Sequence, residues 1–195
     1  PIIVSAGPNG VTARYMSLAD IHVTPYTSAE DALLSFKAKT VCLFRGKVIF
    51  GRPVENGVVH GHRVRMSRVG DFEEFASDNG GEVYDLLEGD TPINAVRELS
   101  KVLIVYKQRS IIRGDWIAGV DASTRFQTTV KSEGAISTHS IIDAPMIHYV
   151  VGNKNVYAYD GGARLMPIGD GIREELFTPK RFANISMKEF IHCAY

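Results

Sequence analysis

The apolar residues of this sequence come in short runs of about four or five, separated by glycine, proline and polar residues. There are 18 glycines and 8 prolines, and no apolar run approaches the ~20 residues that a membrane-spanning helix needs. Short apolar runs bounded by turn residues are typical of antiparallel strands. The pattern therefore predicts an all-β fold in which helices are few and short.

Nine segments have the composition of strands: residues 41–44, 47–50, 63–66, 102–106, 110–112, 116–120, 126–130, 147–151 and 156–159. Several neighbours are joined by polar or glycine-containing turns, at residues 45–46, 107–109 and 152–155. Glycine and asparagine supply the positive φ angles that tight hairpin turns require. We therefore expect three hairpins at these places.

Helical signals are confined to three short segments. Residues 27–30 have the spacing of a capping box, which predicts a helix over 28–36. Asp170 followed by two glutamates predicts a second helix over 171–177, because carboxylates favour the first turn. Residues 92–99 have Pro at a helix-start position but also fit a strand, and periodicity leaves both open.

Three segments, residues 41–51, 102–114 and 147–161, repeat the same pattern of apolar strand, polar turn, apolar strand and glycine. Their starts lie 61 and 45 residues apart. Blade-type β-propellers repeat at about 40–50 residues. We therefore predict a single β-rich domain or fragment over residues 1–195, with propeller-like blades at roughly 38–68, 91–130 and 134–168. Three blades do not close a propeller, so a partial one is expected. The alternative is three unrelated hairpins in a β-sandwich.

Charge is balanced overall but unevenly placed. The 22 Lys and Arg match the 22 Asp and Glu, which argues against a protein built to coat nucleic acid or an anionic membrane. Residues 69–90, here called the acidic stretch, carry eight acidic residues and no Lys or Arg. Residues 43–68 and 97–113, on either side, are basic. Either these charges dock one protomer on another, or the acidic stretch folds back over its own basic hairpins.

No metal, cofactor or disulfide is predicted. Cys42 lies in an apolar run and Cys193 near the end, which favours a buried thiol and a terminal thiol over a bridge. His60 and His62 would share one face of a strand, but a lone pair of histidines is weak support for zinc. The sequence as given has no secretory leader pattern at its start.

A set of short motifs follows in a definite order between residues 40 and 178. They are Arg63-Val-Arg-Met-Ser67, Gly70-Asp-Phe-Glu-Glu-Phe75, Leu103-Ile-Val-Tyr-Lys-Gln-Arg-Ser-Ile111, Gly134-Ala-Ile-Ser137, Ile147-His-Tyr149, Val156-Tyr-Ala-Tyr-Asp-Gly161 and Pro167-Ile-Gly169. In order and spacing the set resembles structural proteins of bacteriophage tails, of the β-propeller type found in the tail hub or nozzle of short-tailed phages. Two positions depart from the family: Met66 stands for the usual Trp and Phe72 for the usual Pro.

The resemblance implies a virion protein of the phage tail or neck, made in the bacterial host cytoplasm and assembled as a ring without catalysis. It also implies partners: other copies of the chain and neighbouring tail or portal-adaptor proteins, with no membrane and no specific nucleic acid.

The alternative is a carbohydrate-binding or glycosidase-type β-propeller, since propellers also include such proteins. Asp115, Asp121, Asp143 and Asp160 could supply the two carboxylates of a glycosidase, but each is expected beside a turn, where Asp has a local role. Tyr149, Tyr157 and Tyr159 could stack a sugar or a base, although Tyr157 and Tyr159, two apart on a strand, more simply line one core face. No nucleophile elbow or phosphate loop occurs. We therefore predict no catalytic, cofactor-binding or metal-binding residues.

Overall fold

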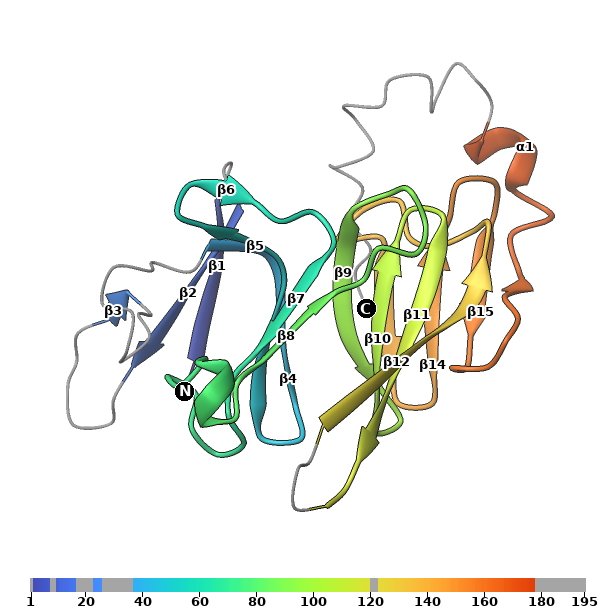
Figure 1. Cartoon of the computed structure of the whole chain (residues 1–195). Coiled ribbons are helices and arrows are strands. Elements are labelled where there is room, and N and C mark those ends of the chain that lie inside the picture. The colour runs from blue at the N-terminus through green and yellow to red at the C-terminus, as the bar shows by residue number, and fades with distance from the viewer. Residues whose placement is uncertain (1, 8–9, 17–22, 26–36, 120–122, 178–195) are drawn as a thin grey trace. The chain divides into compact units, whose positions relative to one another are not determined.

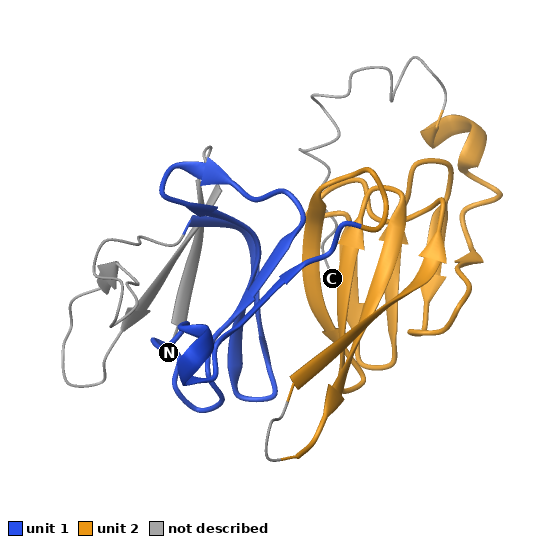
Figure 2. Cartoon of the chain, in the orientation of Figure 1, with its two compact units in different colours: residues 1–87 blue, residues 88–195 orange. Residues whose placement is uncertain are grey.

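The computed structural model describes residues 2–7, 10–16, 23–25, 37–119 and 123–177 (Figure 1). The chain divides into two compact units, residues 1–87 and 88–195, each described by itself below (Figure 2). Strands account for 54% of the structure, in three antiparallel sheets, and helix is limited to very short pieces. The all-β prediction is confirmed. The predicted extents of one domain and three blades stay predictions.

The first unit holds one antiparallel sheet. Its strands are β1 (Ile2–Gly7), β2 (Gly10–Met16), β3 (Val23–Pro25), β4 (Lys37–Phe44), β5 (Lys47–Glu55), β6 (Val58–Val59), β7 (Arg63–Met66) and β8 (Glu82–Asp85). They pair in the order β1-β2-β4-β5-β7-β8, with β3 beside β2 and β6 beside β5. A 3-10 turn, η1 (Ser77–Asn79), lies within the long connection from β7 to β8.

Tight turns with positive φ at both central residues set the register of β5 against its neighbours. Arg45 and Gly46 join β4 to β5 with φ of 52° and 74°, and Asn56 and Gly57 join β5 to β6 with φ of 50° and 79°. This is the geometry of the type I′ turn, whose twist matches that of paired strands. The hairpin predicted at residues 45–46 is confirmed.

The core of the first unit lies along β5 and β7. Val48, Ile49 and Phe50 follow one another in β5 and are all fully buried, so both faces of this strand are covered. The Phe50 and Phe75 rings pack with centroids 5.5 Å apart. Met66, at the position where the phage family has Trp, is also fully buried, so an apolar side chain fills this place in the core.

The second unit holds two four-stranded antiparallel sheets. One is formed by β9 (Ile93–Leu99), β10 (Val102–Lys107), β11 (Ser110–Ile117) and β12 (Ser123–Lys131). The other is formed by β13 (Ile141–Ala144), β14 (Ile147–Val151), β15 (Val156–Tyr159) and β16 (Met166–Pro167). In both sheets the strands pair in chain order (Figure 1). Four antiparallel strands in chain order are the arrangement of a propeller blade.

One strand of the second unit differs from its prediction. The sequence predicts separate strands at 110–112 and 116–120, but the structure has one strand, β11, running from Ser110 to Ile117 through Gly114. A Cβ added at Gly114 would lie 2.9 Å from a side-chain carbon of Thr124 and 3.0 Å from the Phe126 ring. Gly114 therefore marks a close approach of β12 side chains and not a turn.

The helix predictions have three different outcomes. Residues 92–99 form strand β9, which decides between the two possibilities left open. Residues 171–177 contain α1 (Arg173–Leu176), a single turn. Residues 28–36 lie outside the described residues. Within the described part of the chain, no helix is long and apolar enough to span a membrane.

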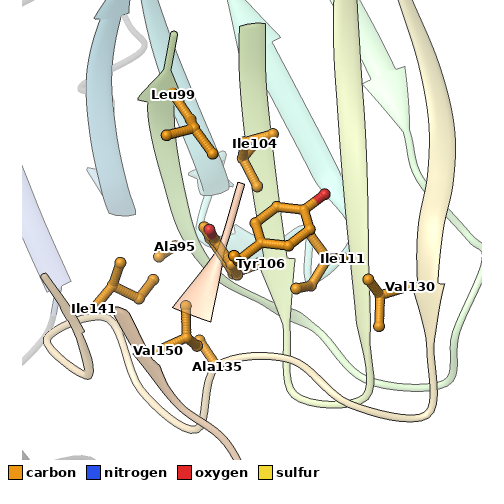
Figure 3. Close-up of a cluster of buried hydrophobic side chains, with 10 residues drawn as sticks. Ala95, Leu99, Ile104, Tyr106, Ile111, Val130, Ala135, Ile141 and Val150 are labelled. Carbon is orange, nitrogen blue, oxygen red and sulfur yellow. The ribbon is translucent and has the colours of Figure 1, made fainter. Parts of the chain in front are cut away.

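A buried apolar cluster lies between the two sheets of the second unit (Figure 3). Ala95, Leu99, Ile104, Tyr106, Ile111 and Val130 come from the first sheet, Ile141, Val150 and Tyr159 from the second, and Ala135 from the connection between them. Tyr106 is central, and its ring meets that of Tyr159 edge-on at 6.2 Å. Burial of apolar area from both sheets holds them together.

Candidate functional site

Some residues of the motifs named above belong to two polar clusters, one in each unit. In the first unit, Arg63 in β7 donates two hydrogen bonds to Asp85, at 2.8 and 2.9 Å, and one to Glu55 at 2.8 Å. Arg65 donates to the other oxygen of Glu55 at 3.0 Å. The hydrogen bonds lower the pKa of Asp85 and raise that of Arg63. These ion pairs join β5, β7 and β8 side by side.

A buried lysine ties the acidic stretch to β5. Lys47 is only 1% exposed and forms an ion pair with Glu82, which also accepts a 2.6 Å hydrogen bond from the Tyr84 hydroxyl. Ser67, the last residue of the first motif, accepts a hydrogen bond from the Val48 amide at 2.9 Å. A buried charge must be paired to be tolerated, so these contacts fix the way β8 returns to the sheet.

Part of the acidic stretch therefore folds back over the basic strands of its own chain. This was one of the two alternatives that the charge pattern left open. Glu82 and Asp85 are the residues that do so. Glu74 instead organises a turn, accepting hydrogen bonds from the Ala76 amide at 2.7 Å and from Asn79 at 3.3 Å. The side chain of Asp78 is exposed.

In the second unit, His148 connects the two sheets. The Tyr106 hydroxyl lies 2.8 Å from His148 Nδ1, and His148 Nε2 lies 3.1 Å from the Glu98 carbonyl oxygen. A carbonyl only accepts, so Nε2 carries the proton and Tyr106 donates to Nδ1. Asp143 Oδ1 lies 3.6 Å from Nε2, and Asp143 also pairs with Arg97 at 3.3 Å. Burial lowers the pKa of His148 and raises that of Tyr106 well above its usual value.

Two further contacts reinforce the same sheet pair. The hydroxyls of Thr129 in β12 and Tyr159 in β15 lie 2.8 Å apart. Gln108 and Asn153, each in a hairpin turn, exchange two hydrogen bonds of 2.9 and 2.7 Å. Both Gln108 and Tyr159 belong to the phage-like motifs. The motif residues Arg63, Arg65, Gln108, His148 and Tyr159 thus join strands or sheets.

The three candidate aspartates that the structure describes have different contacts. Asp115 lies within β11 and pairs with Arg113 at 2.8 Å. Asp143 is the last but one residue of β13, close to the turn at residues 145–146. Asp160 does sit at a turn, where its carboxylate accepts a 2.9 Å hydrogen bond from the Gly162 amide. Asp121 lies outside the described residues.

The other candidates have local environments of their own. His60 Nε2 lies 3.6 Å from Glu55 Oε2, and among the described residues no three potential ligands gather around a metal position. Tyr159 is fully buried, Tyr157 half-buried and Tyr149 exposed, so the three rings do not form one stacking surface. Cys42 is half-buried, and Cys193 lies outside the described residues.

Comparison with known proteins assigns no family. No family model matches the sequence, and no curated protein matches it. Among solved structures, one titled "Kluyveromyces lactis Hsv2 complete loop 6CD", a yeast β-propeller, is similar with a TM-score of 0.45 and 12% identity. The likeness covers 91% of this chain and 52% of that one, so this chain spans about half its length. A score this low assigns no function, and the all-β architecture rests on the chain's own strands.

Proposed function

We propose that this chain is a non-catalytic structural component of a bacteriophage tail or neck, of the hub or nozzle type. In this role it assembles as a ring with other copies of itself and contacts neighbouring tail or portal-adaptor proteins in the virion. The ordered motif set between residues 40 and 178 motivates the proposal.

The observation that carries it is the position of those motif residues. Arg63 and Arg65 bind acidic side chains across three strands, and His148 and Tyr159 join two sheets. A catalytic group has to meet a substrate, whereas His148 and Tyr159 are fully buried. Motif residues that join strands and sheets have a structural role, as we expect in a non-catalytic structural protein.

Exposed charge offers the means of docking. Asp71 and Asp78 of the acidic stretch are exposed, as are Arg45 and Arg109 in the basic regions on either side. Complementary charged surfaces steer association and fix its register. Each protomer carries both signs, so copies of one chain are able to dock head to tail, which is how a closed ring forms.

The test is the assembly state of the purified 195-residue chain. We expect ring-shaped particles by negative-stain electron microscopy and a matching mass by sedimentation velocity. Replacing Asp71 and Asp78 by Lys should weaken assembly, more so at low salt, because exposed charges are screened over about 8 Å at physiological ionic strength.

A matched control changes charge by the same amount elsewhere: Glu174 and Glu175 of α1, both exposed, replaced by Lys. This variant should assemble as the parent does. A chain that remains monomeric across concentration and salt would contradict the proposal, and equal loss of assembly in both variants would contradict the role of the acidic stretch.

A further inference from the structure

The second unit has a pocket of about 430 Å³ that no motif described above explains. It is lined by Glu88, Gly89, Arg109, Ser110, Thr128, Lys131 and Ser132. These residues come from the segment before β9, the β10–β11 turn and the first residue of β11, and the end of β12 with the residue after it. Ligand pockets usually measure about 300–1,000 Å³ and are mostly apolar. This one has the size of a ligand pocket, and every residue that lines it except Gly89 carries a polar or charged side chain.

One wall of the pocket is held in place by a buried lysine. Lys107 is fully buried, and its Nζ donates hydrogen bonds to the carbonyl oxygens of Glu88, at 2.8 Å, and Gly89, at 3.3 Å. Burial lowers the pKa of Lys107. Gly89 has a φ of +77° and lies so close to Ser110 that a Cβ there would be 2.7 Å from Ser110 Oγ. The wall is thus built before any ligand arrives.

Ser110 has a buried hydroxyl without a partner. The residue is 3% exposed, and its Oγ makes no hydrogen bond within the described part of the chain. A buried polar group left unsatisfied is destabilising, and such groups in native proteins are few. Ser110 lines the pocket, so a ligand atom there would supply the missing hydrogen bond.

The charged side chains that line the pocket indicate which kind of ligand it could bind. Arg109 and Lys131 are exposed cations, and within the described residues neither forms an ion pair. Glu88 carries the opposing charge and accepts a hydrogen bond from the Thr128 hydroxyl. The two cations suit a phosphate group, which prefers Arg and Lys. A carboxylate beside them suits the hydroxyl groups of a sugar, which donate hydrogen bonds.

We propose that this pocket binds a phosphorylated saccharide, with the phosphate on Arg109, Lys131 and the Ser110 hydroxyl and a sugar hydroxyl on Glu88. The ligand is either a free sugar phosphate or the phosphorylated end of a surface glycan, since both present the same chemistry. This site is independent of the proposed structural function.

The experiment is calorimetric titration of the full chain with glucose 6-phosphate, inorganic phosphate and glucose. Glucose 6-phosphate should bind, with inorganic phosphate weaker and glucose not measurable. Equal binding of inorganic phosphate and glucose 6-phosphate would overturn the saccharide assignment, and binding of none of the three would overturn the site. A lipopolysaccharide core oligosaccharide, before and after phosphatase treatment, distinguishes a surface-glycan source from a free sugar phosphate.

Three variants locate the site. Ser110→Ala and Lys131→Gln should each weaken binding about tenfold or more, because each removes a hydrogen bond to a charged group. Arg125→Gln, an exposed cation on the same strand as Lys131 but outside the lining, should bind as the parent does. Ser110→Ala should keep or raise the melting temperature of the free protein, since it removes an unsatisfied hydroxyl. Unchanged binding in Ser110→Ala and Lys131→Gln, or equal loss in Arg125→Gln, would refute the assignment.

Discussion

Acidification should destabilise the second unit through His148. This ring is fully buried between two sheets, with Tyr106 donating to Nδ1 and the Glu98 carbonyl accepting from Nε2. Burial lowers its pKa below the ordinary 6.5, although Asp143 raises it somewhat and Arg97 lowers it further. The folded state therefore resists protonation more than the unfolded state does.

The sign and size of the effect follow from proton linkage. Above pH 6.5 the ring is neutral in both states, and its contribution to stability is constant. Below pH 6.5 the unfolded chain takes up a proton that the folded chain refuses, so the free energy of unfolding falls. The loss reaches up to about 1.4 kcal/mol for each pH unit until the folded pKa is passed. Against a typical stability of about 5–15 kcal/mol this is a large effect.

Urea denaturation in steps of half a pH unit from pH 8 to pH 5 measures how the free energy of unfolding depends on pH. An NMR titration of the His148 ring measures its pKa in the folded state. Asp143→Asn should lower the folded pKa further and prolong the loss to lower pH. Tyr106→Phe should raise the pKa, because it removes a hydrogen bond to the neutral ring. In His148→Gln the corresponding part of the pH slope should disappear. A folded His148 that titrates at or above pH 6.5, or a slope unchanged in His148→Gln, would refute the reasoning.

Three further predictions concern stability, each measured by urea or thermal denaturation. Glu82→Gln should cost about 3–5 kcal/mol, because it removes the carboxylate that pairs with the buried charge of Lys47. The double variant with Lys47→Met should recover most of this loss, and a double variant no more stable than Glu82→Gln would contradict the prediction. Lys101→Gly should stabilise by about 1 kcal/mol, since Lys101 has a φ of +74° that glycine adopts without strain. Tyr159→Ala should lower the free energy of unfolding by about 3–5 kcal/mol, because the Tyr159 side chain is fully buried. Lys154→Ala should change it by no more than about 0.5 kcal/mol, because the Lys154 side chain is 81% exposed. The reverse ranking would show that Tyr159 does not anchor the sheets.

Hairpins were predictable from the sequence where turn residues lie between two short apolar runs. The turn at Arg45 and Gly46 and the one near Gln108 lie between two short apolar runs, and both occur in the structure. The strand break placed at Gly114 was wrong, because glycine is selected there by the side chains of Thr124 and Phe126 on another strand. A single sequence read locally carries no sign of that approach.

The polar clusters were less predictable. The basic and acidic regions are visible in the sequence, but nothing in it marks Lys47 as completely buried or Glu55 as the partner of Arg63 and Arg65. Which charges meet depends on the pairing of β5, β7 and β8, whose residues are far apart in the chain. The pocket was missed for the same reason: Glu88 and Lys131 approach only after β9 to β12 have paired.

The chain order of strands in the second unit has a consequence for how this unit folds. Each strand pairs with the one just before or after it, so hairpins can form early with short loops to close. The Tyr106–His148 contact instead joins residues 42 apart, across the two sheets. We expect the sheets to form first and their docking to limit the rate. Substitutions within a hairpin tip should then mainly slow folding, because hairpin contacts are already present when the sheets dock, and substitutions at Tyr106 should slow folding to the extent that its contact with His148 forms in the docking step.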